Sequence, residues 1–506
     1  AGCVSGPDHV PPEMPLPAKF NETGQKDIGD VSTSTWWTAY RDTRLNGLVA
    51  QGFDENLSVL QALERINAAA SGVTVAGAGS LPGLLVGASQ TASGNLGSLS
   101  ATNAATNTSQ GNANVSWLLD LFGQFRRSKE SAQASLDAAY STADVATLAY
   151  IQDLVNSYID LRFFQERLAL SRANLKSRQE TYELTKFQLE AGAASRLDVV
   201  QAEGLVQATQ AEIPGLEINI RVSAHHIATL LGKPAGALLG ELLKPGPQPV
   251  FRGSIKSGIP ADLIRNRPDI RVAERNLAAA TANIGVAISQ LYPTITLSGA
   301  ISPSYVKVAG VSGGSLTSWS FGPTLTLPIF DGGRLRANVD ISKSDAKTQY
   351  LAWKQTVLGA VEEVENALSA VRRDAQTVQA LRAQVKTTQE TLELSTASYK
   401  DGASSLLDVL DAQRQVSLRR DAQTVQALRA QVKTTQETLE LSTASYKDGA
   451  SSLLDVLDAQ RQVSLAQASL AAAVQQVAKD YVSLNVAIGG GYNPGGKPTV
   501  APPKET

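Results

Sequence analysis

The chain has very few of the Cys, His and Met residues that build soft-metal sites and disulfide bonds. Its 506 residues include three His, one Met and a single Cys. A disulfide within the chain is therefore excluded, and a metal centre made of Cys and His clusters is not expected. No run of about 18 apolar residues occurs either, so no transmembrane helix is expected.

Neither sign of charge is in excess, and signatures of catalysis are missing. The chain has 45 basic and 47 acidic residues and a formal net charge of -2. Nucleic-acid-binding proteins usually show a strong basic bias, so nucleic acid is not an expected partner. The sequence has no nucleophile elbow, phosphate-binding loop or metal-ligand spacing, so we expect neither an enzyme nor a cofactor.

Helix-breaking residues are absent from two long stretches. Residues 124–191 contain no Gly or Pro, and residues 334–401 are interrupted only by Gly359. Both stretches consist mainly of Ala, Leu, Gln, Glu, Arg and Ser, and all of these but Ser favour helix. A helix of this length would extend about 100 Å, far beyond an ordinary globular helix. The pattern indicates a long tubular or coiled array.

The two stretches belong to two diverged copies of one unit of about 210 residues. Gly192 and Gly402 lie 210 positions apart, as do the glycines that precede the two stretches. Residues 192–202 (GAASRLDVVQA) align with residues 402–412 (GASSLLDVLDA) at the same offset. Such self-similarity indicates an internally repeated architecture.

Segments in which apolar and polar residues alternate precede each helical stretch. In residues 316–330, Trp, Phe, Leu and Ile alternate with Ser, Thr and Gly. Two hairpins are predicted, with polar loops at residues 93–113 and 302–315. The predicted strands are residues 81–91, 114–122, 293–302 and 316–330.

Each predicted strand is near the length that crosses a bilayer, although a soluble antiparallel sheet alternates in the same way. Four strands cannot close a barrel, and an open edge in lipid leaves backbone groups unpaired. If these strands enter a membrane, several chains must therefore share one barrel.

The single cysteine lies in the sequence AGCV. Bacterial lipoprotein signal peptides end in Leu, a pair of small residues and then Cys, so Cys3 matches the lipid-attachment position of such a signal. A Pro-rich stretch follows at residues 10–17, as expected of a tether. We therefore expect Cys3 to be acylated, although an ordinary free cysteine would have the same local sequence.

Three motifs resemble one known family. Residues 263–299 (LIRNRPDIRVAERNLAAATANIGVAISQLYPTITLSG) closely resemble the signature of the lipoprotein branch of the outer membrane factor family. Residues 117–126 (WLLDLFGQFR) and 327–338 (LPIFDGGRLRAN) resemble that family's strand-to-helix junctions. The family contains the TolC-like exit ducts of tripartite efflux pumps, and this branch is OprM- or NodT-like.

The resemblance implies a mixed α+β membrane protein of the Gram-negative outer membrane, with a large periplasmic portion. It implies a trimeric β-barrel with four strands per chain, continued by a long α-helical periplasmic barrel with a mixed equatorial domain. The expected domains are a lipidated N-terminal tether at 1–34, an equatorial helix at 35–80, a membrane β-hairpin at 81–122, long periplasmic helices at 123–232, an equatorial linker at 233–261, a helix at 262–292, a second hairpin at 293–332, further long helices at 333–488 and a C-terminal tail at 489–506.

The resemblance also implies a gate at the periplasmic tip, where Gly192, Gly402 and Gly449 mark the turns. A ring of carboxylates at a narrow place would attract cations and disfavour anions. Ser195 and Asp198 also have the spacing of a capping box, so stabilising a helix start is an alternative role, compatible with gating. The residues expected at the aperture are Asp198, Tyr399, Asp408 and Asp411, with the duplicate copies Tyr446, Asp455 and Asp458.

The duplicate copies arise because residues 372–418 recur without any change as residues 419–465. The first repeat has 40 residues from Gly192 to Gly232, and the second has 40 from Gly449 to Gly489. The two repeats therefore match if one 47-residue copy is removed. The complete identity of the copies favours a recent or artefactual duplication over a functional extra hairpin.

The function implied by the resemblance is passive conduction of drugs or other small molecules from the periplasm to the exterior. The implied partners are two further copies of the chain, a periplasmic membrane fusion (adaptor) protein, an inner-membrane transporter of the RND type and outer-membrane lipid. A type I secretion duct for polypeptides is the main alternative. A structural coiled-coil rod is more distant, because such a rod needs no alternating aromatic strands.

Overall fold

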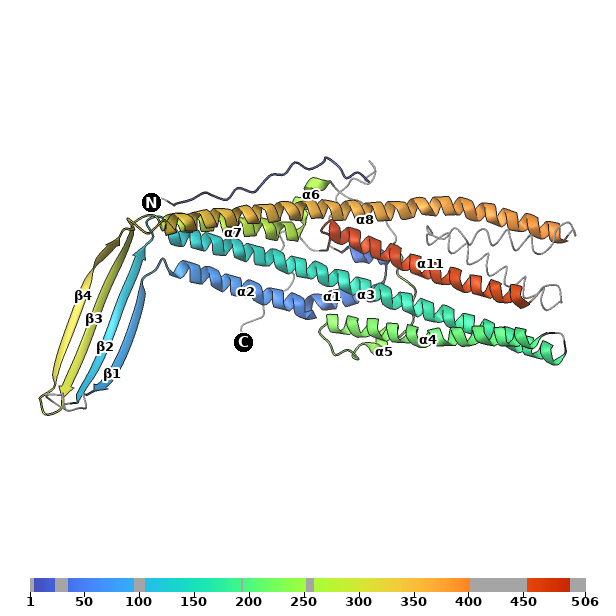
Figure 1. The fold of residues 1–506 in the computed structure, drawn as a ribbon, viewed down its shortest axis with the longest axis horizontal. Helices are drawn as coiled ribbons and strands as arrows, with labels where there is room; N and C mark the ends of the chain where they lie inside the picture. The colour runs from blue at the N-terminus through green and yellow to red at the C-terminus, as the bar shows by residue number, and fades with distance from the viewer. Residues whose placement is uncertain are drawn as a thin grey trace. The chain divides into compact units, whose positions relative to one another are not determined.

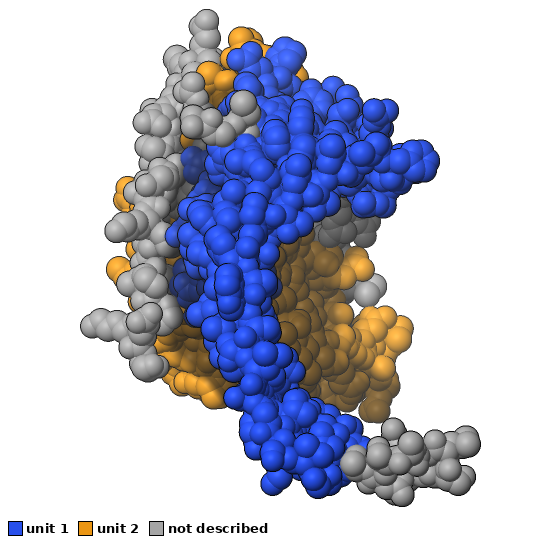
Figure 2. Space-filling model, turned by 90° about the vertical axis from the view of Figure 1, so that its left-hand side faces the viewer, with its two compact units in different colours: residues 1–15, 62–143, 268–357 blue, residues 16–61, 144–267, 358–506 orange. Residues whose placement is uncertain are grey.

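The computed structural model describes residues 4–22, 35–94, 105–192, 194–251, 259–400 and 453–491. These residues form long helices and one antiparallel sheet (Figure 1). The chain divides into two compact units, drawn in different colours in Figure 2. Unit 1 comprises Ala1–Pro15, Ala62–Ala143 and Pro268–Val357, and unit 2 comprises Leu16–Gln61, Asp144–Arg267 and Leu358–Thr506.

Unit 1 contains a four-stranded sheet in the order β1-β2-β3-β4, with every neighbouring pair antiparallel. The β2–β3 pairing joins the hairpin of the first repeat to that of the second, with Trp117 opposite Leu297. The strands are β1 (Gly83–Ser93), β2 (Thr106–Leu119), β3 (Thr294–Val308) and β4 (Gly314–Thr326).

The structure confirms the two hairpins but corrects their boundaries. The predicted loop at 93–113 was wrong in its second half, because β2 already begins at Thr106. The predicted loop at 302–315 was also too long, since β3 continues to Val308. These polar segments pair through backbone hydrogen bonds, which do not require apolar side chains. Strand β4 ends earlier than predicted, at Thr326.

The two predicted long helices are confirmed, as α3 (Gln124–Glu190) and α8 (Arg334–Lys400), each of 67 residues. Asp120 accepts hydrogen bonds from the backbone amides of Phe125 and Arg126 at the start of α3. Asp331 accepts from the amides of Gly333 and Leu335 at the start of α8. Backbone amides at the start of a helix have no acceptor within the helix, and each carboxylate accepts hydrogen bonds from amides of this kind.

The remaining helices of unit 1 are the later part of α2 (Leu57–Ala78) and α7 (Pro268–Ser289). In the described parts of the chain, no helix combines the length and apolar character needed to cross a membrane.

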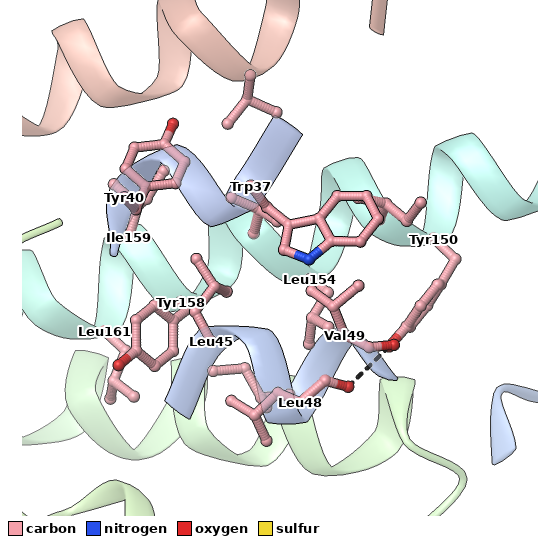
Figure 3. Close-up of a cluster of buried hydrophobic side chains, with 14 of the residues drawn as sticks. Trp37, Tyr40, Leu45, Leu48, Val49, Tyr150, Leu154, Tyr158, Ile159 and Leu161 are labelled. Atoms are coloured by element: carbon pink, nitrogen blue, oxygen red, sulfur yellow. Dashed lines mark hydrogen bonds between the residues drawn. The ribbon is translucent and has the colours of Figure 1, made fainter. Parts of the chain in front are cut away.

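Unit 2 has an aromatic core (Figure 3), although aromatic residues make up only 5% of the chain. Trp36 and Tyr158 are almost fully buried. The hydroxyl of Tyr40 donates to the Ala478 carbonyl at 2.6 Å, which ties the N-terminal part of the unit to its last helix. The elements here are η1 (Trp36–Tyr40), α1 (Thr43–Glu55), α4 (Arg196–Leu230), α5 (Leu239–Leu242), α6 (Pro260–Asn266) and α11 (Leu453–Ala487), with parts of α2, α3 and α8.

The helices repeat the periodicity of the sequence. Helices α4 and α11 both have 35 residues, and their first residues lie 257 positions apart (453 - 196). The first residues of α3 and α8 lie 210 apart (334 - 124), so the difference is 47, the length of the duplicated segment. Gly232 and Gly489 follow α4 and α11 at equivalent places, and both have positive φ angles.

Candidate functional site

The first tip turn joins α3 to α4. Helix α3 is followed by Gly192, whose φ is +76°, a conformation that residues with a Cβ rarely adopt. Its amide donates to the Leu189 carbonyl at 3.0 Å. No atom lies within 4 Å of the place where a Cβ would be, so the turn requires glycine for its backbone conformation and not for space.

Ser195 and Asp198 begin α4 with a complete capping box. The Ser195 hydroxyl accepts from the Asp198 amide at 3.2 Å, and Asp198 Oδ2 accepts from the Ser195 amide at 2.8 Å. The Ser195 hydroxyl also donates to the same carboxylate oxygen at 2.7 Å. Capping is therefore confirmed for Asp198, and its role in a gate stays a prediction.

The second tip is only partly described. Gly402, Asp408, Asp411, Tyr446 and Gly449 lie outside the described residues.

Three further predicted residues have a described backbone. Tyr399 lies in α8, and Asp455 and Asp458 lie in α11, but their side chains are outside the described part. Asp455 is the third residue of α11, as Asp198 is the third of α4. The two repeats therefore have an aspartate at the same position in the helix sequence.

A polar layer joins α3, α4 and α11 about 14 residues before the first tip turn, and sequence reasoning missed it. Arg178 on α3 donates to the carbonyl of Leu205 at 3.3 Å and to the hydroxyls of Thr209 and Ser464. Gln460 on α11 donates to Thr181 on α3 at 2.6 Å. No local pattern marks these residues, because each has its partner in a distant part of the sequence.

The Arg178 guanidinium makes its described hydrogen bonds to neutral oxygen atoms. Burial lowers its pKa, and the negative charge of Glu212 opposes that shift. Its Nε atom is buried and has no hydrogen-bond partner among the described groups, and the same holds for Oε1 of Gln460. Because unsatisfied polar atoms are costly, the layer adds less to stability than a fully satisfied network would. Removing one of its members would still destabilise the protein, since the remaining partners would be left unpaired.

The sheet of unit 1 exposes large apolar side chains on β4. Trp319 is 78% exposed, Phe321 75% and Leu325 65%, and these three residues alternate with polar ones as predicted. Leu327 and Ile329 are also exposed, but they lie beyond the end of the strand. Contiguous exposed apolar surface of this kind marks a contact with lipid or protein.

Cys3 lies outside the described residues, but the segment after it is described. Residues 4–9 contact the start of α3 through the side chain of Arg127, which is 4% exposed. Sequence reasoning predicted only a tether here and missed Arg127.

Comparison with known proteins shows what the chain is similar to. A family model described as "Outer membrane efflux protein" matches residues 48–233, 259–424 and 416–490. The last two ranges overlap inside the duplicated segment, so the second repeat is matched in two pieces. "Nodulation protein T" of Rhizobium leguminosarum bv. viciae is 57% identical over 505 residues, covering 100% of this chain and 93% of the relative.

Two further relatives are described as outer-membrane proteins. "Outer membrane protein OprJ" of Pseudomonas aeruginosa is 34% identical over 418 residues, 81% of this chain and 87% of OprJ. The solved structure of the outer-membrane channel OprN is 30% identical, with a TM-score of 0.75, and the match covers 97% of this chain and 100% of OprN. The expected fold class is confirmed by this match, with four strands per chain and long helices. The chain belongs to the outer membrane efflux protein family.

Proposed function

We propose that the chain is the exit duct of a tripartite efflux pump and that it works as a homotrimer. The open sheet carries this proposal. In the described residues β1 pairs only with β2, and β4 only with β3, so both edges of the sheet are unpaired. An unpaired edge is not stable inside a bilayer, and pairing β4 of one chain with β1 of the next would remove every edge.

The exposed side chains of the sheet fit a lipid contact. Trp319 and Phe321 would be an aggregation hazard in water but are suited to the apolar band of a membrane barrel. Helices α3 and α8 would continue the barrel as a periplasmic tunnel, since 67 residues extend about 100 Å. Drugs or other small molecules would pass through passively.

The gate would lie at the tip turns, with aspartates at the helix starts facing the opening. Asp198 on α4 and Asp455 on α11 are the pair that the two repeats place equivalently. Three-fold symmetry would give six such carboxylates, a local charge that favours cations. Tyr399, Asp408, Asp411, Tyr446 and Asp458 are further candidates for the aperture.

The proposed partners follow from this place in a pump. A periplasmic adaptor would contact the tip, and an inner-membrane transporter of the RND type would supply the cargo. Two relatives are described as an outer-membrane protein and an outer-membrane channel, which supports a place in that membrane. A lipid on Cys3 would add an anchor to the barrel.

Chemical cross-linking in detergent and planar-bilayer recording test the proposal together. We expect a trimer that inserts into bilayers and conducts ions. A stable monomer without conductance would contradict the duct. Cys3→Ser should abolish acyl labelling and leave trimer insertion intact, because four strands per chain hold the protein in the membrane.

A further inference from the structure

Residues 4–9 are seated against the junction between β2 and α3 in unit 1. The amide of Ser5 donates to the Phe122 carbonyl at 3.1 Å. At the other end of the segment, His9 Nε2 lies 2.5 Å from a carboxylate oxygen of Glu274 on α7. The segment therefore has partners at both ends, one in the loop between β2 and α3 and one on α7.

Arg127 holds the middle of this segment. Its Nε donates to the Ser5 carbonyl at 3.0 Å, and its Nη2 donates to the Gly6 carbonyl at 3.1 Å and to Asp8 at 2.7 Å. Nη1 donates to Glu130 at 2.7 Å, so each of the three guanidinium nitrogens makes a hydrogen bond. Burial acts to lower the pKa of Arg127, but the hydrogen bonds and charges of Asp8 and Glu130 outweigh it and raise the pKa.

Glycines let the segment approach this closely. Gly6 has a φ of +90°, and a Cβ on it would lie 2.5 Å from the Cα of Gly285 on α7. A Cβ on Gly285 would lie 2.6 Å from the Ser5 carbonyl oxygen. On the other side, a Cβ on Gly123 would lie 3.1 Å from Val4. Backbone packs on backbone here, which requires residues without side chains on both surfaces.

We propose that Arg127, Gly123, Gly285 and Glu274 form an intramolecular dock for residues 4–9, which fixes a lipid on Cys3 beside the β2–α3 junction. The inference rests on the proposed lipid attachment. A free tether of about 15 residues would spread over roughly 20 Å, so it would leave the acyl chains undirected. The dock confines the acyl chains to the junction between β2 and α3. Arg127 is the residue that positions the segment.

Hydrogen exchange on the full-length trimer tests the dock. Arg127→Met keeps the length of the side chain but removes its donors, and we expect the Ser5 amide to exchange on the order of tenfold faster or more. Arg172→Met is the control on the same helix, because the exposed guanidinium of Arg172 pairs with Glu217, far along α3 from the segment. Equal exchange in the parent and in Arg127→Met would overturn the dock.

Gly6→Val changes the docked segment itself and leaves the sequence of α3 unchanged. We expect it to release the segment as Arg127→Met does, because the added side chain would collide with Gly285. Palmitate labelling of the same proteins tests the lipid separately, and we expect label in the parent and all variants. Absence of label from the parent would overturn the lipid positioning, whereas unchanged exchange in labelled variants would overturn the dock alone.

Discussion

The side chain of Gln460 on α11 donates a hydrogen bond to the hydroxyl of Thr181 on α3, with 2.6 Å between nitrogen and oxygen. Gln460 belongs to the second copy of the duplicated segment, and its counterpart in the first copy is Gln413. Helix α8 therefore ends in the first copy of the duplicated segment. Helix α11, which packs against α3 through this contact, begins in the second copy.

Removal of residues 419–465 should leave a folded, conducting trimer. The deletion restores the 40-residue spacing between the tip glycine and the glycine after the returning helix, and it leaves the sequences of both helices unchanged. Circular dichroism, thermal unfolding and bilayer recording check this. An unfolded product would show that the extra copy is integral to the structure.

The two roles of Asp198 can be separated by substituting each partner of the capping box. Ser195→Ala removes the cap but keeps the charge, so we expect a loss of about 1 kcal/mol in stability and unchanged ion selectivity. Asp198→Asn keeps a hydrogen-bond acceptor but removes the charge, so cation preference should fall with little loss of stability. Reversal potentials and unfolding midpoints report the two effects, and unchanged selectivity in Asp198→Asn would exclude the gate role.

The duplicate aspartates should differ in their importance. Asp455 has the same position in α11 as Asp198 in α4, so Asp455→Ala and Asp458→Ala should change single-channel conductance and weaken cation preference. Asp408→Ala and Asp411→Ala should have smaller effects in the chain as it stands. The opposite order would place the first copy at the aperture.

Arg178 should control how α11 is held against the hairpin of α3 and α4. We expect Arg178→Gln to destabilise the protein by about 1–3 kcal/mol, because Thr209 and Ser464 lose a charged donor. Arg172→Gln is the control on the same helix, since its exposed ion pair with Glu217 is worth at most about 1 kcal/mol.

Stability should fall at alkaline pH, and Tyr158 should account for part of the fall, because burial also raises the pKa of Tyr40 and of Tyr150. Burial and the hydrogen bond to Asp42 raise the pKa of Tyr158 to about 12, against the opposing influence of Arg162. Its ordinary pKa is about 10, so the unfolded chain loses this proton first and stability declines between roughly pH 10 and 12. Tyr158→Phe should therefore reduce the slope of unfolding free energy against pH in this range without abolishing it.

The long helices could be predicted because their signal is local. Two stretches almost free of Gly and Pro, each followed by Gly, mark α3 and α8 to within a residue of their ends. The capping box of α4 could also be predicted from the sequence, since Ser195 and Asp198 lie three residues apart. Where neighbouring residues decide the structure, the amino-acid pattern was sufficient.

The ends of the strands were harder to predict from the sequence, because strand pairing depends on the backbone of another segment. Thr106 looked like part of a loop, but it lies opposite Ser93 on one side and Val308 on the other. The contacts of Arg178 and Arg127 were not predictable at all. Each arginine looks like an ordinary surface residue of a polar helix, and each makes a hydrogen bond to a residue more than 100 positions away.

The pairing of β2 with β3 also bears on how such a chain could evolve. The two strands come from different repeats, so a contact that separate half-length chains would have to make between molecules is made here within one. Six half-length chains could form the same ring with true six-fold symmetry. Joining two half-length chains into one lowers the symmetry to three-fold. One repeat can then change in sequence while the other is preserved, so one can evolve to close the duct while the other evolves to bind a partner.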